Sequence, residues 1–220
     1  MQELKLFTMT GAVCVALLVL LFSLSTRADA DTNLPRPDVG GGTGIYRLLE
    51  ERASAPRNAF PKGAVSEAEL ATILWAASGR NRDGGGWTIP LAMGRPPYVR
   101  IYALSPEGAY LYLFADHSLR EVAKKDVRKQ VAKDGFAEAA PWLLLFVADP
   151  EILKGFGNEE RARGFAYVAA GAMSQNVYLA AGDMGIATRY LATLDAAGAA
   201  EALDLPDGAF PICLMPLAKK

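Results

Sequence analysis

The sequence predicts a single α+β domain, and three segments carry this prediction. Apolar and polar residues alternate over residues 99–103, and a Ser-Pro-Glu-Gly turn leads into a return strand over residues 109–114. Residues 142–148 form an unbroken apolar run, typical of a strand buried on both faces. Residues 159–184 form the longest helical pattern. Because helices and strands are mixed without a regular βαβ repeat, we expect the α+β class.

Shorter elements complete this outline. A first helix is predicted over residues 45–51, and the Ser-Glu-Ala-Glu phrase at residues 66–69 is a capping box that opens a second helix. That helix should end near Gly79, and one of its faces carries Leu70, Ile73, Leu74 and Ala77. The apolar segment 210–217 predicts a final strand that leads into the basic C-terminus.

The first thirty residues have the pattern of an export signal. Lys5 is the only basic residue ahead of an uncharged apolar run over residues 9–24, and residues 28–30 read Ala-Asp-Ala, which suits a signal peptidase. We expect cleavage after Ala30, a periplasmic or secreted protein, and no membrane association of the mature chain. The alternative is an uncleaved N-terminal anchor. Cys14 lies inside the apolar run rather than at its end, which argues against a lipoprotein.

Composition excludes several classes of function. Cleavage would remove two basic and two acidic residues, so the net charge would stay at -1, and no basic surface for nucleic acid is predicted. Cys213 would be the sole cysteine of the mature chain, which rules out an internal disulfide and indicates core packing. His117 is the only histidine and lies in a predicted turn, which excludes a multi-histidine metal site and argues against a Ser-His-Asp hydrolase.

Residues 31–44 are interpreted as a linker and residues 45–220 as the domain. The linker contains two prolines and the phrase Gly-Gly-Gly-Thr-Gly. That phrase follows no strand and lacks the Gly-Lys-Ser/Thr ending of a phosphate-binding loop, so we interpret it as a flexible segment.

A series of short phrases resembles the nitroreductase-like flavoproteins, and within them the SagB-type or thiazoline-oxidase-like branch. Each phrase is weak alone, but their order and spacing together are specific, and they cover most of the mature chain. In chain order they are residues 48–54 with Arg57, residues 70–82, residues 88–90, residues 108–112, residues 140–141, residues 170–171, residues 175–181 and residues 184–188.

This resemblance implies a central mixed or antiparallel sheet flanked by helices, in a domain-intertwined homodimer. It also implies an FMN cofactor held between the subunits, and an enzyme that exchanges a hydride between flavin and a small organic substrate. The long helix 159–184 is rich in alanine and glycine, so we expect it to pack at the two-fold interface. Since the cofactor performs the redox step, no catalytic acid or base is assigned.

The resemblance assigns the two ends of the flavin to separate segments. Guanidinium, ammonium and hydroxyl groups bind phosphate, and the candidates for the phosphate end are Arg52, Ser54, Arg57, Lys219 and Lys220. The candidates beside the isoalloxazine ring are Pro90, Leu91 and Ala92 on one edge and Leu191, Ala192 and Thr193 on the other face. A backbone N–H of Ala192 or Thr193 is expected to point towards flavin N5.

Several residues depart from the family pattern. Arg57 lies one residue further from Ser54 than in the signature, Leu91 replaces a serine, Gly94 replaces a polar residue, and Trp87 replaces an arginine. These departures leave open a rival reading, an exported binding or scaffold relative that has lost the flavin. If the flavin is retained, the candidate aromatic residues of the substrate pocket are Trp87, Tyr98, Phe156 and Tyr190.

Overall fold

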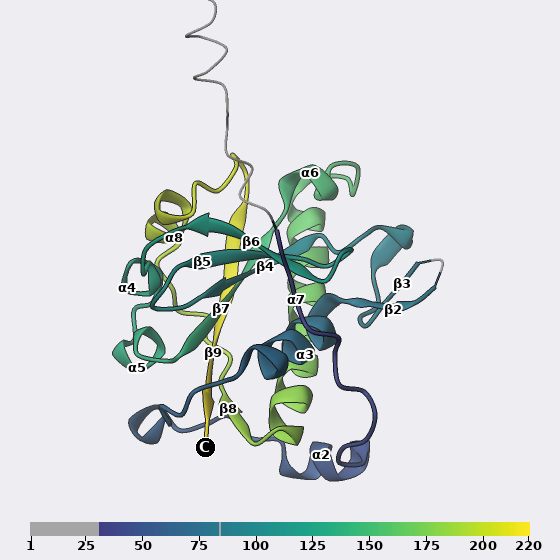
Figure 1. The fold of residues 1–220 in the computed structure, drawn as a ribbon. Helices are drawn as coiled ribbons and strands as arrows, with labels where there is room; N and C mark the ends of the chain where they lie inside the picture. Colours follow the sequence, from purple (N-terminus) through teal and green to yellow (C-terminus); the bar gives the residue numbers. More distant parts are fainter. Residues whose placement is uncertain (1–30, 84) are drawn as a thin grey trace, which may run out of the picture. The chain divides into compact units, whose positions relative to one another are not determined.

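A seven-stranded antiparallel sheet lies at the centre of the computed structural model, which describes residues 31–83 and 85–220 (Figure 1). The strand order is β1-β6-β5-β4-β7-β9-β8. The strands are β1 (Thr32–Asn33), β4 (Val99–Leu104), β5 (Ala109–Leu113), β6 (Ser118–Ala123), β7 (Trp142–Ala148), β8 (Ile186–Thr188) and β9 (Phe210–Lys219). The predicted α+β class is therefore confirmed, and the sheet is antiparallel at every pairing between these strands.

Strand β7 is buried on both faces, as its apolar run predicts. Leu144 and Phe146 belong to the core on one side of the sheet, whereas Leu145 and Val147 belong to a second core on the other side. Strands β4 and β9 pair with its two edges. Because neither face meets solvent, β7 has no need of the polar alternation seen in half-exposed strands.

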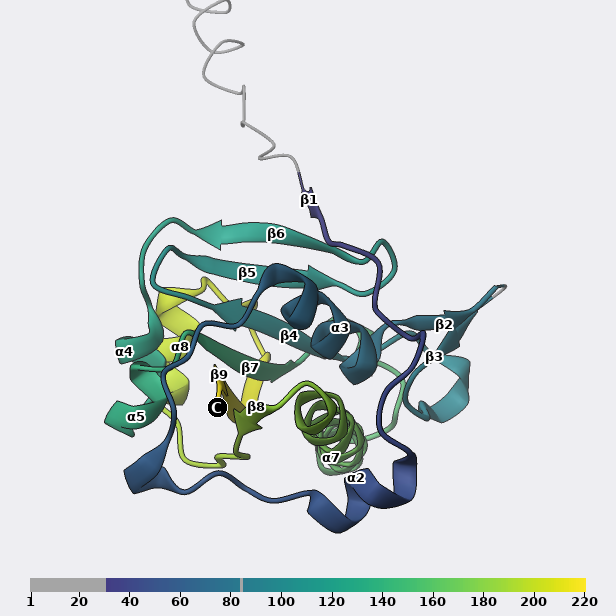
Figure 2. The ribbon, with the colours of Figure 1, turned by 60° about the horizontal axis from the view of Figure 1, so that its bottom comes forward.

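Helices cover both faces of the sheet (Figure 1). The long helix α7 (Glu159–Asp183) and α3 (Glu67–Ser78) pack on one face, and α2 (Ile45–Glu51) contacts α7 (Figure 2). The other face carries α4 (Arg128–Val131), α5 (Gly135–Glu138) and α8 (Ala196–Ala202). Smaller elements are α6 (Pro150–Leu153), the 3-10 turns η1 (Arg57–Ala59) and η2 (Ala92–Gly94), and the hairpin of β2 (Arg80–Arg82) and β3 (Gly86–Trp87).

The capping box of α3 forms as predicted. Ser66 Oγ accepts a hydrogen bond from the Glu69 N–H at 3.3 Å, and the Glu69 carboxylate accepts one from the Ser66 N–H at 2.9 Å. These two bonds satisfy backbone donors that a helix start would otherwise leave without a partner. The helix ends at Ser78 with Gly79 as its C-cap, in agreement with the predicted stop.

The small residues of α7 do not all face outward. Ala169, Ala170 and Ala181 are buried within the protomer, against α3 and the sheet. These three alanines are therefore not available to a partner chain, because α3 and the sheet already pack against them. A different stripe of α7 is exposed, and it consists of Arg161, Gly164, Tyr167, Val168 and Gly171.

The start of the expected linker is part of the sheet. Strand β1 pairs with β6, Asp31 forms an ion pair with Arg120 at 2.9 Å, and Leu34 is buried. His117 links this segment to β5, because its two ring nitrogens lie 2.8 Å from the Tyr112 hydroxyl and 2.8 Å from the Pro35 carbonyl. Composition alone favoured an unpaired segment, but the open edge of β6 provides backbone partners for it.

Cys213 on β9 belongs to the core. Its side chain is fully buried, and burial raises the pKa of its thiol to about 12, which fits the predicted packing role. The expected signal and its cleavage site at Ala30 lie outside the described residues. Within residues 31–83 and 85–220, none of the helices is long and apolar enough to cross a membrane.

Burial of β7 leads to a stability prediction. Val147→Ala should lower the free energy of unfolding by about 2 kcal/mol, because it removes two methyl groups from a side chain that is 2% exposed. Val122→Ala on β6 is the matched control, and its 37% exposure predicts a change within about 0.5 kcal/mol. Urea unfolding of both variants measures the difference, and equal losses would contradict the central place of β7.

Candidate functional site

A cavity of about 430 Å³ lies beside the segment that follows α2, the C-terminal half of α7, and strand β8. Figure 1 shows α2, the end of α7, β8 and the chain's C-terminus at one end of the domain. The volume falls in the range typical of small-molecule pockets, roughly 300–1,000 Å³. The lining residues are Leu48, Glu51, Arg52, Ala53, Ser54, Ala55, Pro56, Ala59, Pro61, Tyr178, Gly182, Ile186, Ala187, Thr188 and Lys220.

The charge of this cavity favours an anion. Arg52 and Lys220 line it, and neither forms an ion pair with another residue of the described chain. The one acidic lining residue, Glu51, is paired with Arg47 at 2.5 Å. Two cationic side chains are therefore left for an anionic ligand, and phosphate and carboxylate are the groups that a guanidinium binds through two parallel hydrogen bonds.

Ser54 lies within a hydrogen-bonded group in the same cavity. Its hydroxyl oxygen is 2.7 Å from the Tyr178 hydroxyl, and the Tyr178 oxygen also accepts a hydrogen bond from the Tyr190 N–H at 2.7 Å. The Arg52 guanidinium lies over the Tyr178 ring, 5.2 Å from its centroid. Cation–π contact of this kind holds a guanidinium in place without using its hydrogen-bond donors.

Thr188 at the end of β8 adds a hydroxyl hydrogen-bond donor that was not among the residues predicted from the sequence. Its backbone carbonyl accepts from the Ala55 N–H at 3.0 Å, and Arg189 donates to the Ala55 carbonyl at 2.9 Å, so β8 holds residues 52–56 in place. The Thr188 side chain lines the cavity, is 3% exposed, and its Oγ1 has no partner among the described residues. An unpaired buried hydroxyl costs roughly 1–3 kcal/mol, so the site fits a ligand that accepts this bond.

Two of the predicted phosphate ligands have other partners. Arg57 pairs with Asp134 at 3.2 Å, and it does not line the cavity. Lys219 pairs with the carboxylate of Glu69 and donates to the Met184 carbonyl at 2.8 Å. The alternation of β9 explains the second case, because successive residues of a strand point to opposite sides and Lys220, not Lys219, lines the cavity.

Residues 191–193, predicted to lie against one face of the flavin ring, have two different environments. The Leu191 side chain is buried in the core under α8, and its N–H and C=O both pair with Leu214 at 2.9 Å. This residue is therefore core and cannot contact a flavin face. Ala192 and Thr193 are exposed, and neither N–H donates to an acceptor in the described part of the chain.

Residues 90–92, predicted to lie along one edge of the flavin ring, are outside the cavity. Pro90 is exposed, whereas Leu91 and Ala92 pack against the edge of the core that includes α7. None of the three lines the cavity that holds Arg52. The next residue, Met93, adopts a left-handed backbone with φ of 58°, a conformation that is uncommon for a residue with a side chain.

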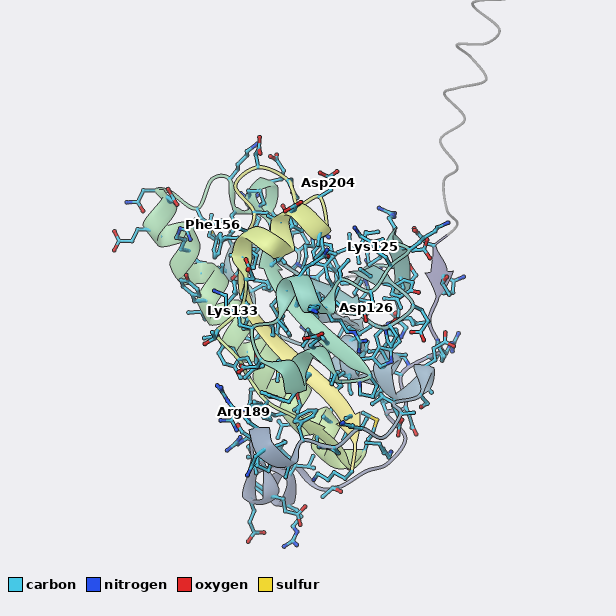
Figure 3. All side chains as sticks on the ribbon, turned by 90° about the vertical axis from the view of Figure 1, so that its left-hand side faces the viewer. Lys125, Asp126, Lys133, Phe156, Arg189 and Asp204 are labelled. Atoms are coloured by element: carbon cyan, nitrogen blue, oxygen red, sulfur yellow. The ribbon has the colours of Figure 1, made fainter. Side chains whose placement is uncertain are left out.

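The predicted pocket aromatics also separate. Tyr98 and Phe156 are buried, and their rings meet edge to face with centroids 5.2 Å apart, so the expectation that they line a pocket is wrong. Figure 3 places Phe156 at the end of the molecule opposite Arg189, the residue that follows Thr188. Trp87 contacts Phe114, and Tyr190 is partly exposed.

Comparison with known proteins identifies the class of protein to which this fold belongs. The model of the Nitroreductase family matches residues 49–219, which is most of the chain. The protein therefore belongs to the Nitroreductase family, a family of flavin oxidoreductases.

Individual relatives agree with this assignment. A protein of Methanocaldococcus jannaschii that carries a nitroreductase name is 31% identical over 164 residues, which cover 69% of this chain and 80% of the relative. A crystal structure from Ralstonia eutropha JMP134, also titled a nitroreductase, is similar with a TM-score of 0.79 and 28% identity, over 88% of this chain and 90% of that one.

A third similarity concerns the fold alone. A chain of the Escherichia coli microcin synthetase McbBCD complex superposes with a TM-score of 0.60 at 16% identity, over 100% of this chain and 98% of that one. The arrangement of sheet and helices is thus shared well beyond the range of sequence similarity.

Proposed function

We propose that this protein is an FMN-dependent oxidoreductase of the SagB-type or thiazoline-oxidase-like branch, which exchanges a hydride between flavin and a small organic substrate. The observation that carries the proposal is the cavity in which Arg52, Ser54, Thr188 and Lys220 present two cations and two hydroxyl groups. These groups suit the phosphate of FMN in charge and in hydrogen bonding.

The chain's own residues have binding and orienting roles. Bound FMN would supply the hydride chemistry, so no side chain needs to act as an acid or base. Arg52 and Lys220 neutralise the phosphate, and the hydroxyl groups of Ser54 and Thr188 donate hydrogen bonds to its oxygens. The unpaired N–H groups of Ala192 and Thr193 are the candidates for a donor towards flavin N5.

The site is proposed to be completed by a second copy of the chain. Residues 90–92 do not line the cavity of their own protomer, so we assign them to the cavity of the partner. Exposed apolar side chains mark the surfaces for this contact: Tyr46 on α2 is 87% exposed, and Val168 on α7 is 69% exposed. Gly164 and Gly171 lie in the same stripe of α7 as Val168 and would let two helices approach closely.

Export remains part of the proposal. The signal pattern of residues 1–30 favours a periplasmic or secreted protein, or a membrane-anchored one if the segment is retained. The rival function, an exported relative without flavin, predicts a colourless protein to which added FMN does not bind.

The phosphate end can be tested by titration with FMN and with riboflavin, which lacks the phosphate. Arg52→Ala should weaken FMN binding at least about tenfold by removing charge-assisted donors. Thr188→Val should weaken it about fivefold or more, because it deletes a hydroxyl at nearly constant volume. Riboflavin affinity should stay unchanged in both variants.

Controls separate binding from folding in this test. Thr188→Val should not destabilise the flavin-free protein, because the hydroxyl has no partner among the described residues. Arg36→Ala, an exposed arginine outside the cavity, should bind FMN like the wild type. Unchanged FMN affinity in both cavity variants would show that the phosphate binds elsewhere.

The homodimer leads to a second prediction. Multi-angle light scattering should give twice the chain mass at micromolar concentration, and Val168→Asp should shift the protein towards monomer and lower FMN affinity, since charge in an apolar contact is costly. Val122→Asp on β6 is the control. A monomeric wild type that still binds FMN would contradict the two-subunit site.

The export signal leads to a third prediction. Intact-mass analysis of the protein recovered outside the cytoplasm should give a chain that begins at Asp31, because residues 28–30 provide the small-residue pattern of a cleavage site. Ala30→Asp should block processing, and Asp31→Ala should not. A membrane-bound species that retains Met1 would overturn this part of the proposal.

A further inference from the structure

Tyr178 on α7 contacts two of the four residues proposed to bind the phosphate, Ser54 and Arg52. Its hydroxyl oxygen is 2.7 Å from Ser54 Oγ and accepts a hydrogen bond from the Tyr190 N–H at 2.7 Å. Its ring lies below the Arg52 guanidinium at 5.2 Å. Tyr178 therefore joins the segment that contains Arg52 and Ser54 to the backbone of Tyr190.

The direction of these hydrogen bonds can be worked out from the donors. A backbone N–H can only donate, so the Tyr178 oxygen accepts from Tyr190. The single phenolic proton has Ser54 Oγ as its nearest acceptor among the described residues. In the direction that leaves the Ser54 O–H for a ligand, the Tyr190 N–H donates to the Tyr178 oxygen and the Tyr178 O–H donates to Ser54 Oγ.

This direction has a consequence for Ser54. A serine oxygen that already accepts from Tyr178 keeps its own proton for another partner, and that partner can be an anion in the cavity. Consecutive hydrogen bonds polarise one another, which strengthens the last donor in the series. If the direction were reversed, Ser54 would present a lone pair towards the cavity and repel a phosphate oxygen.

We propose that Tyr178 is a positioning residue that orients the Ser54 proton towards the phosphate of the flavin and holds Arg52 above the same site. The inference rests on the proposed function, because the anion is taken to be the phosphate of FMN. Tyr178 itself acts through Ser54 and Arg52. The same hydroxyl also accepts a hydrogen bond from the backbone N–H of Tyr190.

A double-mutant cycle on the full chain tests the hydroxyl. Tyr178→Phe and Ser54→Ala should each weaken FMN binding about tenfold, and the double variant should also lose about tenfold rather than a hundredfold, because the two hydroxyls act as one unit. Tyr178→Leu should lose more than Tyr178→Phe, since it also removes the ring below Arg52. Riboflavin is the probe without phosphate, and its affinity should change by less than about twofold in Tyr178→Phe.

The ³¹P chemical shift of bound FMN distinguishes a positioning role of Tyr178 from a role in folding alone. Tyr178→Phe and Ser54→Ala should shift this resonance in the same direction, because both withdraw the same donor from the phosphate. Tyr110→Phe on β5, outside the cavity, should leave it in place. Thermal unfolding of the flavin-free variants checks that the fold is retained, and phenylalanine fills the space of the tyrosine ring.

The outcomes separate this inference from the proposed function. A wild-type protein that binds no FMN overturns the proposed function and the role of Tyr178 with it. FMN binding that survives Tyr178→Phe at full strength, additive losses in the cycle, or an unmoved ³¹P resonance would overturn the role of Tyr178 alone.

Discussion

Burial of β7 on both faces is the constraint on which the rest of the structure depends. A strand without a solvent face needs a helical layer on each side and a paired strand on each edge, and the chain provides all four. Pairing of β9 with β7 brings the C-terminus to the end of the sheet, and β8 then pairs with β9 there. The cavity that contains Arg52 and Lys220 forms where β8 meets α7.

Hydrogen bonds to the backbone of Ala55, rather than the two cations that line the cavity, fix the segment after α2. The bond from the Ala55 N–H to the Thr188 carbonyl and the bond from Arg189 to the Ala55 carbonyl join the segment after α2 to β8. The backbone segment that carries Arg52 is therefore positioned before any ligand arrives, which lowers the entropic cost of binding. Their charges remain unneutralised within the described residues, as expected of groups that serve a ligand.

Family membership indicates an oxidoreductase, and the cavity contributes a different kind of information. The family implies a flavin, whereas the cavity accounts for how one end of such a cofactor would be bound. The position of residues 90–92 outside the cavity is consistent with a site shared between two chains. It also limits what one protomer can do alone, since the ring would lack one of its expected walls.

The sequence by itself determined the elements that local patterns encode. Strand β7, the capped helix α3 and the extent of α7 could all be found from periodicity and capping residues. Only the tertiary structure decided the partners of individual side chains. Lys219 pairs with Glu69, 150 positions away, and no local pattern encodes that contact.

The same reason explains the residues that sequence reading assigned wrongly or missed. Leu191 is core because β9 pairs with it, and Thr188 lines the cavity with a buried hydroxyl that has no partner among the described residues. Both properties depend on which distant segment lies alongside, so they are decided by packing. The patterns that predict the helices and strands are local, since they recur every three to four residues in a helix and every two residues in a strand.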